Sequence, residues 1–87
     1  MKVATRIVFK INKNFSEWAK AFDDDRSSQK AAGIKAIFRG VSENDSSTVM
    51  AILEAEPGVL GKYMEGNKEV EASGHILGSE EFSNWLA

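Results

Sequence analysis

GIKAIFRGVSENDSSTVMAILEAEP, residues 33–57, is the stretch that decides the fold. Two runs rich in β-branched and other apolar residues flank a polar, turn-like centre at Ser42–Ser47. Strands favour β-branched residues, whereas turns favour Asn, Asp and Ser. The stretch therefore predicts a β-hairpin, and we expect this hairpin to form the middle of a sheet.

Both faces of the predicted hairpin are apolar. Because side chains alternate along a strand, the two faces of the first run carry Ile34, Ala36, Phe38 and Gly40, and Lys35, Ile37, Arg39 and Val41. The two faces of the second run carry Val49, Ala51, Leu53 and Ala55, and Thr48, Met50, Ile52 and Glu54. A sheet with one wet face would alternate apolar and polar residues. Helices must therefore cover one face, and a second sheet or a second subunit must cover the other.

The hairpin is preceded by a predicted strand and a predicted helix. Alternation over Val3–Ile11 indicates the strand. The helix is expected from Asn14, a suitable N-cap, to Ala32, with Gly33 as a left-handed C-terminal residue. Its apolar residues recur at helical spacing at Phe15, Trp18, Ala19 and Phe22. Its polar second half, residues 23–30, is expected to project into solvent.

A second helix and a last strand follow the hairpin. The helix is expected from Pro57, which suits a first helical position, to about Ser73, with Gly74 as its C-terminal residue. Its apolar residues are Val59, Leu60, Tyr63, Met64 and Val70. His75–Leu77 is expected to start the short last strand. For residues 79–87, a helical turn and an extended continuation of the strand both fit the pattern.

The order β-α-β-β-α-β predicts one α+β domain over residues 1–87. This is the ferredoxin-like arrangement, a four-stranded antiparallel sheet with two helices on one face. The apolar face left bare then predicts a homodimer in which two sheets pack together, because symmetric pairs are the commonest assembly. Trp85, close to the C-terminus, indicates that the tail also docks on the partner subunit.

Composition narrows the classes of function. Eleven basic and thirteen acidic residues give a net charge of −2, which does not favour binding to nucleic acid or to an anionic membrane. The absence of cysteine excludes a disulfide framework and fits a reducing compartment. No signal peptide or membrane-spanning run is visible in the sequence. We therefore expect a cytoplasmic protein with neither nucleic acid nor membrane as a partner.

Four segments carry a resemblance to a known family: FSEWAKAFD, GIKAIFRGVSENDSSTV, EAEPGV and SGHILGSEEFSNWL. With these segments the chain resembles a small family of bacterial proteins of unknown function. That family is similar to the dimeric α/β-barrel superfamily, which includes antibiotic-biosynthesis-type monooxygenases and haem-degrading monooxygenases. The resemblance implies that the ferredoxin-like domain pairs as a dimeric α/β barrel, with a ligand cavity between the sheet and the helices.

His75 is the candidate catalytic residue, because an imidazole titrates near neutral pH and serves as a base or a ligand. The alternative is a strand-start histidine bonded to the backbone. In haem-degrading relatives, the resemblance implies iron binding by a histidine near the end of the second helix, together with a helix tryptophan and a first-strand asparagine. This chain has His75, but Arg6 lies in the middle of the first strand and the second helix lacks tryptophan. We therefore expect no cofactor, with haem as the alternative.

Further candidates concern a small organic ligand. Trp18, Phe22 and Tyr63 are expected to line its pocket with His75, although aromatic residues at helical spacing also form ordinary cores. Arg6 is a candidate for binding an acidic ligand. Its alternatives are a pair with Glu54 across the dimer and exposure to solvent. No metal site is expected at residues 23–25, because consecutive helical residues point about 100° apart and three carboxylates in a row cannot face one ion.

These observations predict a small-ligand-binding homodimer of the dimeric α/β-barrel type. A monooxygenase-like enzyme that uses His75, cofactor-independent or haem-linked, is the alternative function. A structural or regulatory interaction module that uses the tail around Trp85 is the second alternative. No nucleophile–base pattern in the sequence favours the enzyme.

Overall fold

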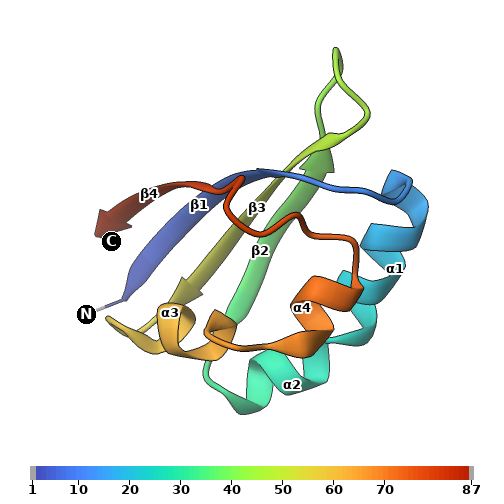
Figure 1. The fold of residues 1–87 in the computed structure, drawn as a ribbon. Helices are drawn as coiled ribbons and strands as arrows, with labels where there is room; N and C mark the ends of the chain where they lie inside the picture. The colour runs from blue at the N-terminus through green and yellow to red at the C-terminus, as the bar shows by residue number, and fades with distance from the viewer. Residues whose placement is uncertain (1, 87) are drawn as a thin grey trace.

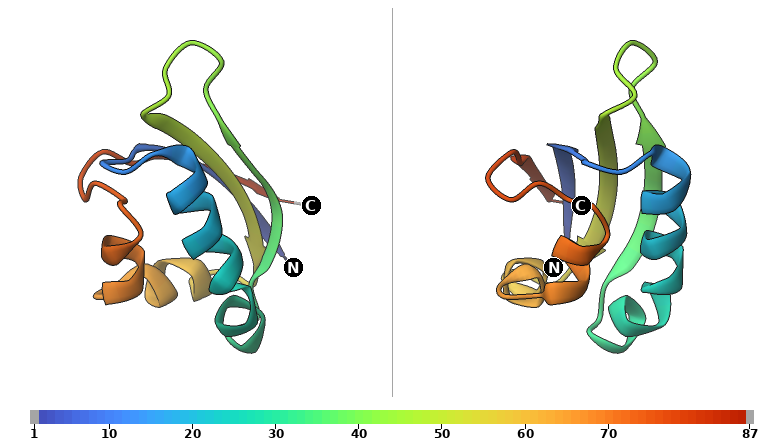
Figure 2. Two further views of the ribbon diagram at one scale, coloured as in Figure 1. Left: turned by 90° about the vertical axis from the view of Figure 1, so that its right-hand side faces the viewer. Right: turned by 45° about the vertical axis from the view of Figure 1, so that its right-hand side comes forward.

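The computed structural model describes residues 2–86 and confirms the ferredoxin-like arrangement (Figure 1). Its elements in chain order are β1 Val3–Lys10, α1 Phe15–Asp24, α2 Arg26–Ala31, β2 Lys35–Val41, β3 Thr48–Ala55, α3 Val59–Met64, α4 Lys68–Ala72 and β4 Glu81–Leu86. The sheet is antiparallel, with strand order β2-β3-β1-β4. Figure 2 shows that the helices of the described chain all lie on one side of this curved sheet.

The predicted hairpin is present as β2 and β3, joined by the turn that projects beyond the sheet (Figure 1). The prediction that the hairpin forms the middle of the sheet is correct for β3 and wrong for β2. β3 is central because it pairs with both β1 and β2, whereas β2 is an edge strand. The reason is topological: β1 pairs with β3, so β2 is left with one neighbour.

A β-bulge in β2 changes which residues face the helices. The register passes from Ala36 opposite Leu53 to Phe38 opposite Ile52, so Ile37 is the extra residue. A bulge shifts the alternation by one residue. The predicted faces therefore hold for Ile34 and Ala36, and they are exchanged for the residues after the bulge: Phe38, Arg39, Gly40 and Val41.

The first predicted helix is interrupted once, at Asp25, between α1 and α2. Its ends are as predicted: the Asn14 side chain accepts a hydrogen bond from the Glu17 backbone N–H at 2.9 Å, and Gly33 has a φ of +85°. The prediction that its second half projects into solvent holds for most of residues 23–30 but not for Gln29, which is buried with only 6% of its surface exposed. This half of the helix contacts β2 and packs over the sheet.

The second predicted helix is in fact two short helices, α3 and α4. Gly58 and Gly66 have φ of +83° and +66°, values that interrupt a right-handed helix and that glycine adopts without steric penalty. Pro57 is therefore not at the first helical position, because the left-handed Gly58 separates it from α3. Gly74, with φ of +103°, follows α4 as predicted.

The last strand begins later than expected. His75 forms an isolated β-bridge with Ile11, and the strand β4 starts only at Glu81. From there the chain is extended and pairs with β1, with Val8 opposite Glu81 and Val3 opposite Leu86. Of the two alternatives for the tail, the extended one is therefore correct over β4, and Ala87 lies outside the described residues.

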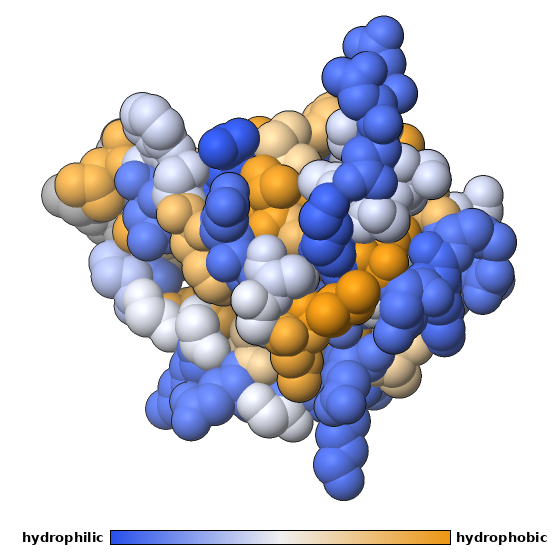
Figure 3. Space-filling model, turned by 45° about the horizontal axis from the view of Figure 1, so that its top comes forward, coloured by the Kyte–Doolittle hydropathy of each residue, from blue (hydrophilic) through white to orange (hydrophobic). Residues whose placement is uncertain are grey.

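The core lies between the sheet and the helices. Its buried apolar residues are Ile7, Phe9, Ile11, Trp18, Ala19, Ile34, Val49, Ala51, Leu53, Ala55 and Leu60. The opposite face of the sheet has no cover from the described chain (Figure 2), and Phe38 and Trp85 are 47% and 64% exposed. Figure 3, which views the molecule with the top of Figure 1 turned forward, shows hydrophobic residues in orange exposed between hydrophilic residues in blue.

Candidate functional site

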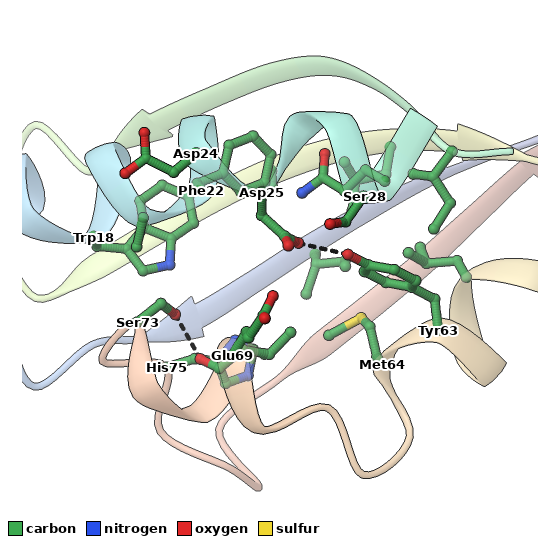
Figure 4. Close-up of a pocket in the computed structure, with 18 of the residues that line it drawn as sticks. Trp18, Phe22, Asp24, Asp25, Ser28, Tyr63, Met64, Glu69, Ser73 and His75 are labelled. Atoms are coloured by element: carbon green, nitrogen blue, oxygen red, sulfur yellow. Dashed lines mark hydrogen bonds between the residues drawn. The ribbon is translucent and has the colours of Figure 1, made fainter. Parts of the chain in front are cut away.

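A cavity of about 490 Å³ lies between the sheet and the helices. The sheet supplies an apolar floor made of Ile7, Phe9, Ala51 and Leu53. The pair α1–α2 forms one wall and the pair α3–α4 the other (Figure 4). Cavities of this size, mostly apolar and with a few polar groups, are the usual form of small-molecule sites.

One side of α1–α2 carries four of the lining residues at a spacing of four, three and four positions. They are Trp18, Phe22, Asp25 and Gln29. Residues at this spacing share one helical face. Trp18 is 2% exposed and packs against Phe9, with ring centroids 5.6 Å apart and an edge-on angle of 63°. The wall is therefore aromatic at one end and polar at the other.

The polar end of this wall is tied to the opposite wall by Tyr63 of α3. The Tyr63 hydroxyl donates a hydrogen bond to Asp25 Oδ2 at 2.6 Å (Figure 4). Burial, that hydrogen bond and the negative charge of Asp25 raise the pKa of Tyr63 to about 12, and the Glu69 carboxylate adds to the shift. The phenol is therefore protonated at neutral pH and serves as a hydrogen-bond donor.

Gln29 brings a buried amide to the same end of the cavity. Its side-chain oxygen accepts no hydrogen bond from any residue of the described chain, although the residue borders the cavity. Such a group normally finds a partner, because an unsatisfied buried acceptor costs about 1–3 kcal/mol. A half-turn of the side-chain amide exchanges its oxygen and nitrogen, and a ligand that donates a hydrogen bond to the oxygen in that orientation would supply the missing partner.

His75 borders the other end of the cavity and is paired with Glu80. The His75 Nε2 lies 2.5 Å from Glu80 Oε1, and the ring stacks on Phe9 at a centroid distance of 4.1 Å. Burial alone would raise the pKa of the Glu80 carboxyl, but hydrogen bonds from His75 and from backbone N–H groups, including that of Gly78, lower it below its ordinary value. Glu80 is therefore a carboxylate at neutral pH and fixes the orientation of the imidazole.

Backbone hydrogen bonds hold His75 against β1. The Asn12 N–H donates to the Gly74 carbonyl at 2.8 Å, and the Ile76 N–H donates to the Lys10 carbonyl at 2.9 Å. The imidazole is thus carried by a segment that is anchored on both sides of His75. This anchoring keeps a buried polar side chain at a defined place beside the cavity.

The sequence matches the family described as Domain of unknown function (DUF3764) over residues 2–87. The chain belongs to this family. Among curated proteins, none matches it in sequence.

Solved structures share the fold of this DUF3764 chain. A variant of SnoaB, a cofactor-independent oxygenase from Streptomyces nogalater, superimposes with a TM-score of 0.67 at 10% identity, covering 99% of this chain and 92% of SnoaB. A putative antibiotic biosynthesis monooxygenase from Caulobacter crescentus CB15 gives a TM-score of 0.65 at 18% identity, covering 99% and 89% of the two chains. The resemblance to the antibiotic-biosynthesis-monooxygenase-like structures is therefore confirmed. At these identities it establishes the fold alone.

The structure brings most of the predicted ligand-binding residues together in the DUF3764 chain. Trp18, Phe22, Tyr63 and His75 all border the cavity. Arg6 does not: it is exposed on the opposite face of the sheet, where its side chain lies near Ser83 and Met50. Its position opposite Ile52 in the register places it on the uncovered face.

Several polar residues of the site were not predicted, and three of them illustrate why: Asp25, Gln29 and Glu80. Asp25 and Gln29 continue the helical stripe of Trp18 and Phe22, so their spacing indicates the cavity face. Their polarity indicates solvent exposure instead, and for this reason they were not predicted to line the cavity. Glu80 carried no such signal, because it lies in the segment between His75 and β4, where no periodic pattern applies.

The geometry of His75 does not fit haem ligation. Its Nε2 is already hydrogen-bonded to Glu80, its ring lies flat on Phe9, and its side chain is 3% exposed.

Within residues 2–86 there is also no group of three or more His, Cys, Asp or Glu side chains that could hold a metal ion. None of the described helices has the length and apolar character needed to cross a membrane.

A second hollow of about 600 Å³ lies on the same side of the sheet, between α3 and β4. Its lining is mostly apolar and includes Leu77, Phe82 and Leu86, which are more than half exposed. The buried polar pairs described above lie outside it, apart from Glu80. The cavity with His75 and Gln29 is therefore the better candidate for a specific site.

Proposed function

We propose that this protein binds a small organic ligand in the cavity between the sheet and the helices. The observation that carries the proposal is Gln29, a residue of the cavity wall whose buried amide oxygen lacks a partner in the described chain. The Tyr63–Asp25 pair at the same end provides further polar groups for orienting a ligand. Binding would stabilise the fold in proportion to the logarithm of ligand concentration.

We also propose that the protein works as a homodimer through the uncovered face of the sheet. The side chains on this face include the half-buried Val8, Met50 and Ile52, and the exposed Phe38 and Trp85. Monomeric proteins rarely leave such a contiguous apolar surface bare. A second copy supplies a matching sheet, and a symmetric contact is the simplest way to cover both.

Trp18 provides a direct reporter for ligand binding. In a Trp85→Phe background, Trp18 is the remaining tryptophan, and it lies in the cavity wall. Mass spectrometry of gently purified protein is expected to identify a bound organic molecule, and adding that molecule back is expected to change Trp18 fluorescence and raise the melting temperature.

A cavity-filling variant tests the location. Ala21 borders the cavity on α1, whereas Ala31 is exposed on α2 and does not. Ala21→Phe should abolish both the co-purified molecule and the fluorescence response, and Ala31→Phe should preserve them. Equal retention of the ligand in both variants would show that it binds elsewhere.

The His75–Glu80 pair favours a second candidate function, a cofactor-independent oxygenase like the one named for SnoaB. With Nε2–H donating to the Glu80 carboxylate, a neutral imidazole carries its lone pair on Nδ1. Such a nitrogen can take a proton from an acidic C–H or O–H of a ligand. The electron-rich anion that remains is the form that reacts with molecular oxygen.

This candidate is tested with the co-purified molecule. Incubation in air with the wild type is expected to give a product that has gained one oxygen atom and lost two hydrogen atoms, because the second atom of O2 leaves as water, and incubation under argon is not. His75→Gln should still bind the molecule but should not convert it. Binding without conversion in air by the wild type would leave ligand binding as the function and remove the oxygenase.

A further inference from the structure

We propose that the cavity takes an organic cation: a protonated amine with N–H donors, attached to a flat apolar body. This inference rests on the proposed ligand-binding function and names the chemical class of the ligand. Three features of the cavity carry it, namely its charge, its unsatisfied acceptor and its aromatic wall.

The charged groups around the cavity are nearly all acidic. Asp24, Asp25 and Glu69 border it, and neither lysine nor arginine does. Asp24 is already paired with Lys20 at 2.8 Å. Asp25 and Glu69 have no cationic partner within 4 Å in the described chain, and Figure 4 shows them reaching into the cavity from opposite walls. The site therefore holds two carboxylates that lack a counter-charge.

The Tyr63 hydroxyl lies beside these carboxylates. It donates to Asp25 at 2.6 Å, and the charges of Asp25 and Glu69 both raise the pKa of Tyr63. Asp25 is partly buried and Glu69 is exposed at the rim of the cavity, so the two like charges repel each other across it. A cation placed between them would relieve this repulsion.

Gln29 specifies the donor character of this cation. Gln29 is 6% exposed, its buried amide oxygen has no partner among residues 2–86, and the residue borders the cavity one helical turn from Asp25. The Gln29 N–H donates to the Asp25 carbonyl at 2.9 Å, which fixes the two side chains on one face. With the amide turned so that its oxygen faces the cavity, an ammonium group can donate to both the amide oxygen and the carboxylate, whereas a quaternary amine lacks the N–H groups to do so.

The rest of the wall suits the apolar body of the ligand. Trp18 and Phe22 pack with ring centroids 5.1 Å apart and, together with Phe9, present aromatic surface to the cavity. Aromatic faces attract cations and stack on flat groups. A carboxylate-bearing ligand would instead meet Asp25 and Glu69 as like charges. A neutral alcohol would satisfy Gln29 but would leave both carboxylates without a counter-charge.

Three probes of similar size separate these cases: 2-phenylethylamine, 2-phenylethanol and 3-phenylpropanoate. Binding is measured by Trp18 fluorescence in the Trp85→Phe protein and by calorimetry on the wild type. We expect the amine to bind about tenfold or more tightly than the alcohol, because hydrogen bonds between charged groups contribute about 1.5–3 kcal/mol. The propanoate should bind most weakly, and added salt should weaken amine binding only.

Variants assign the effect to the two carboxylates. Asp25→Asn keeps an acceptor for Tyr63, and Glu69→Gln keeps the side-chain shape. Each should reduce amine affinity by about tenfold while leaving alcohol affinity nearly unchanged. Glu71→Gln is the matched control, because Glu71 is exposed on the same helix and does not border the cavity.

The outcomes separate this inference from the proposed function. If the alcohol or the propanoate binds as tightly as the amine, or if the two variants leave amine binding unchanged, the cation assignment is overturned and the cavity remains a ligand site. If none of the three probes binds the wild type, the cation assignment is overturned as well, and the proposed function is decided by the co-purified molecule and the Ala21→Phe variant.

Discussion

The amide oxygen of Gln29 is a buried acceptor without a partner in the described chain, beside an apolar cavity. Replacing Gln29 by Met removes this acceptor and keeps the side-chain length and helix propensity nearly constant. We predict that Gln29→Met raises the free energy of unfolding by about 1 kcal/mol, measured by urea denaturation without ligand. Gln29→Glu, which adds a charge one turn from Asp25, should lower it. A less stable Gln29→Met protein would show that the amide has a structural partner.

The contribution of Glu80 to stability is expected to depend on pH. Its folded pKa is lowered, despite burial, by the hydrogen bonds from His75 and the backbone. A group with a depressed folded pKa stabilises the fold above its unfolded pKa, and this contribution is lost as pH falls through the folded pKa. Glu80→Gln should therefore cost about 1–2 kcal/mol at pH 7. The difference from the wild type should shrink below pH 4.5, the ordinary value. A difference that stays constant down to pH 3 would contradict this assignment.

At the residue scale, the sequence predicts the apolar part of the site better than its polar part. Trp18 and Phe22 follow from helical spacing alone. Asp25 and Gln29 occupy the next positions of the same stripe. Because polar residues on a helix usually face solvent, their polarity predicts exposure, whereas their spacing predicts the cavity face. Glu80 reaches His75 through a segment without periodicity, and only the folded chain reveals this contact.

At the element scale, the order of strands and helices follows from alternation and from Gly33 and Gly74, which end helices with positive φ. The bulge at Ile37 does not follow from the sequence, because an inserted residue in a strand carries no compositional mark. Its consequence is large: it turns Arg39 toward the helices, where its guanidinium donates to Asp23 at 2.8 and 2.7 Å. The break between α3 and α4 lies at Gly66, one of several glycines in that stretch.

Two glycines of the α3–α4 stretch give opposite predictions. Gly61 lies inside α3 with ordinary helical φ, and an added methyl group would meet open space. Gly66 has φ of +66°, which an L-residue adopts only with strain. Gly61→Ala should therefore raise the free energy of unfolding by about 0.5–1 kcal/mol, and Gly66→Ala should lower it by about 1 kcal/mol. Equal effects of the two substitutions in thermal denaturation would mean that α3 and α4 form one helix in solution.

At the scale of the whole molecule, the helices cover only one of the two apolar faces of the sheet (Figure 2). A chain of 87 residues has limited capacity to bury its own surface, and association adds to what it can bury. The hairpin between β2 and β3 and the terminal strand β4 both contribute to the uncovered face, through Phe38 and Trp85. The proposed dimer would therefore cover this face of the outer strands β2 and β4 as well as that of the central strands.

Ile52 is the position from which the proposed dimer can be tested without disturbing the cavity. It lies on central β3, between Arg6 of β1 and Phe38 of β2 in the register, on the uncovered face. A lysine there adds a charge beside Arg6, so Ile52→Lys should convert a dimer into a monomer in light scattering while the circular dichroism spectrum is unchanged. Leu77→Lys, at an exposed residue on the helix side of the sheet, should remain dimeric. Wild-type protein that stays monomeric into the high micromolar range would exclude the proposed interface, because two copies would then leave this apolar face in water.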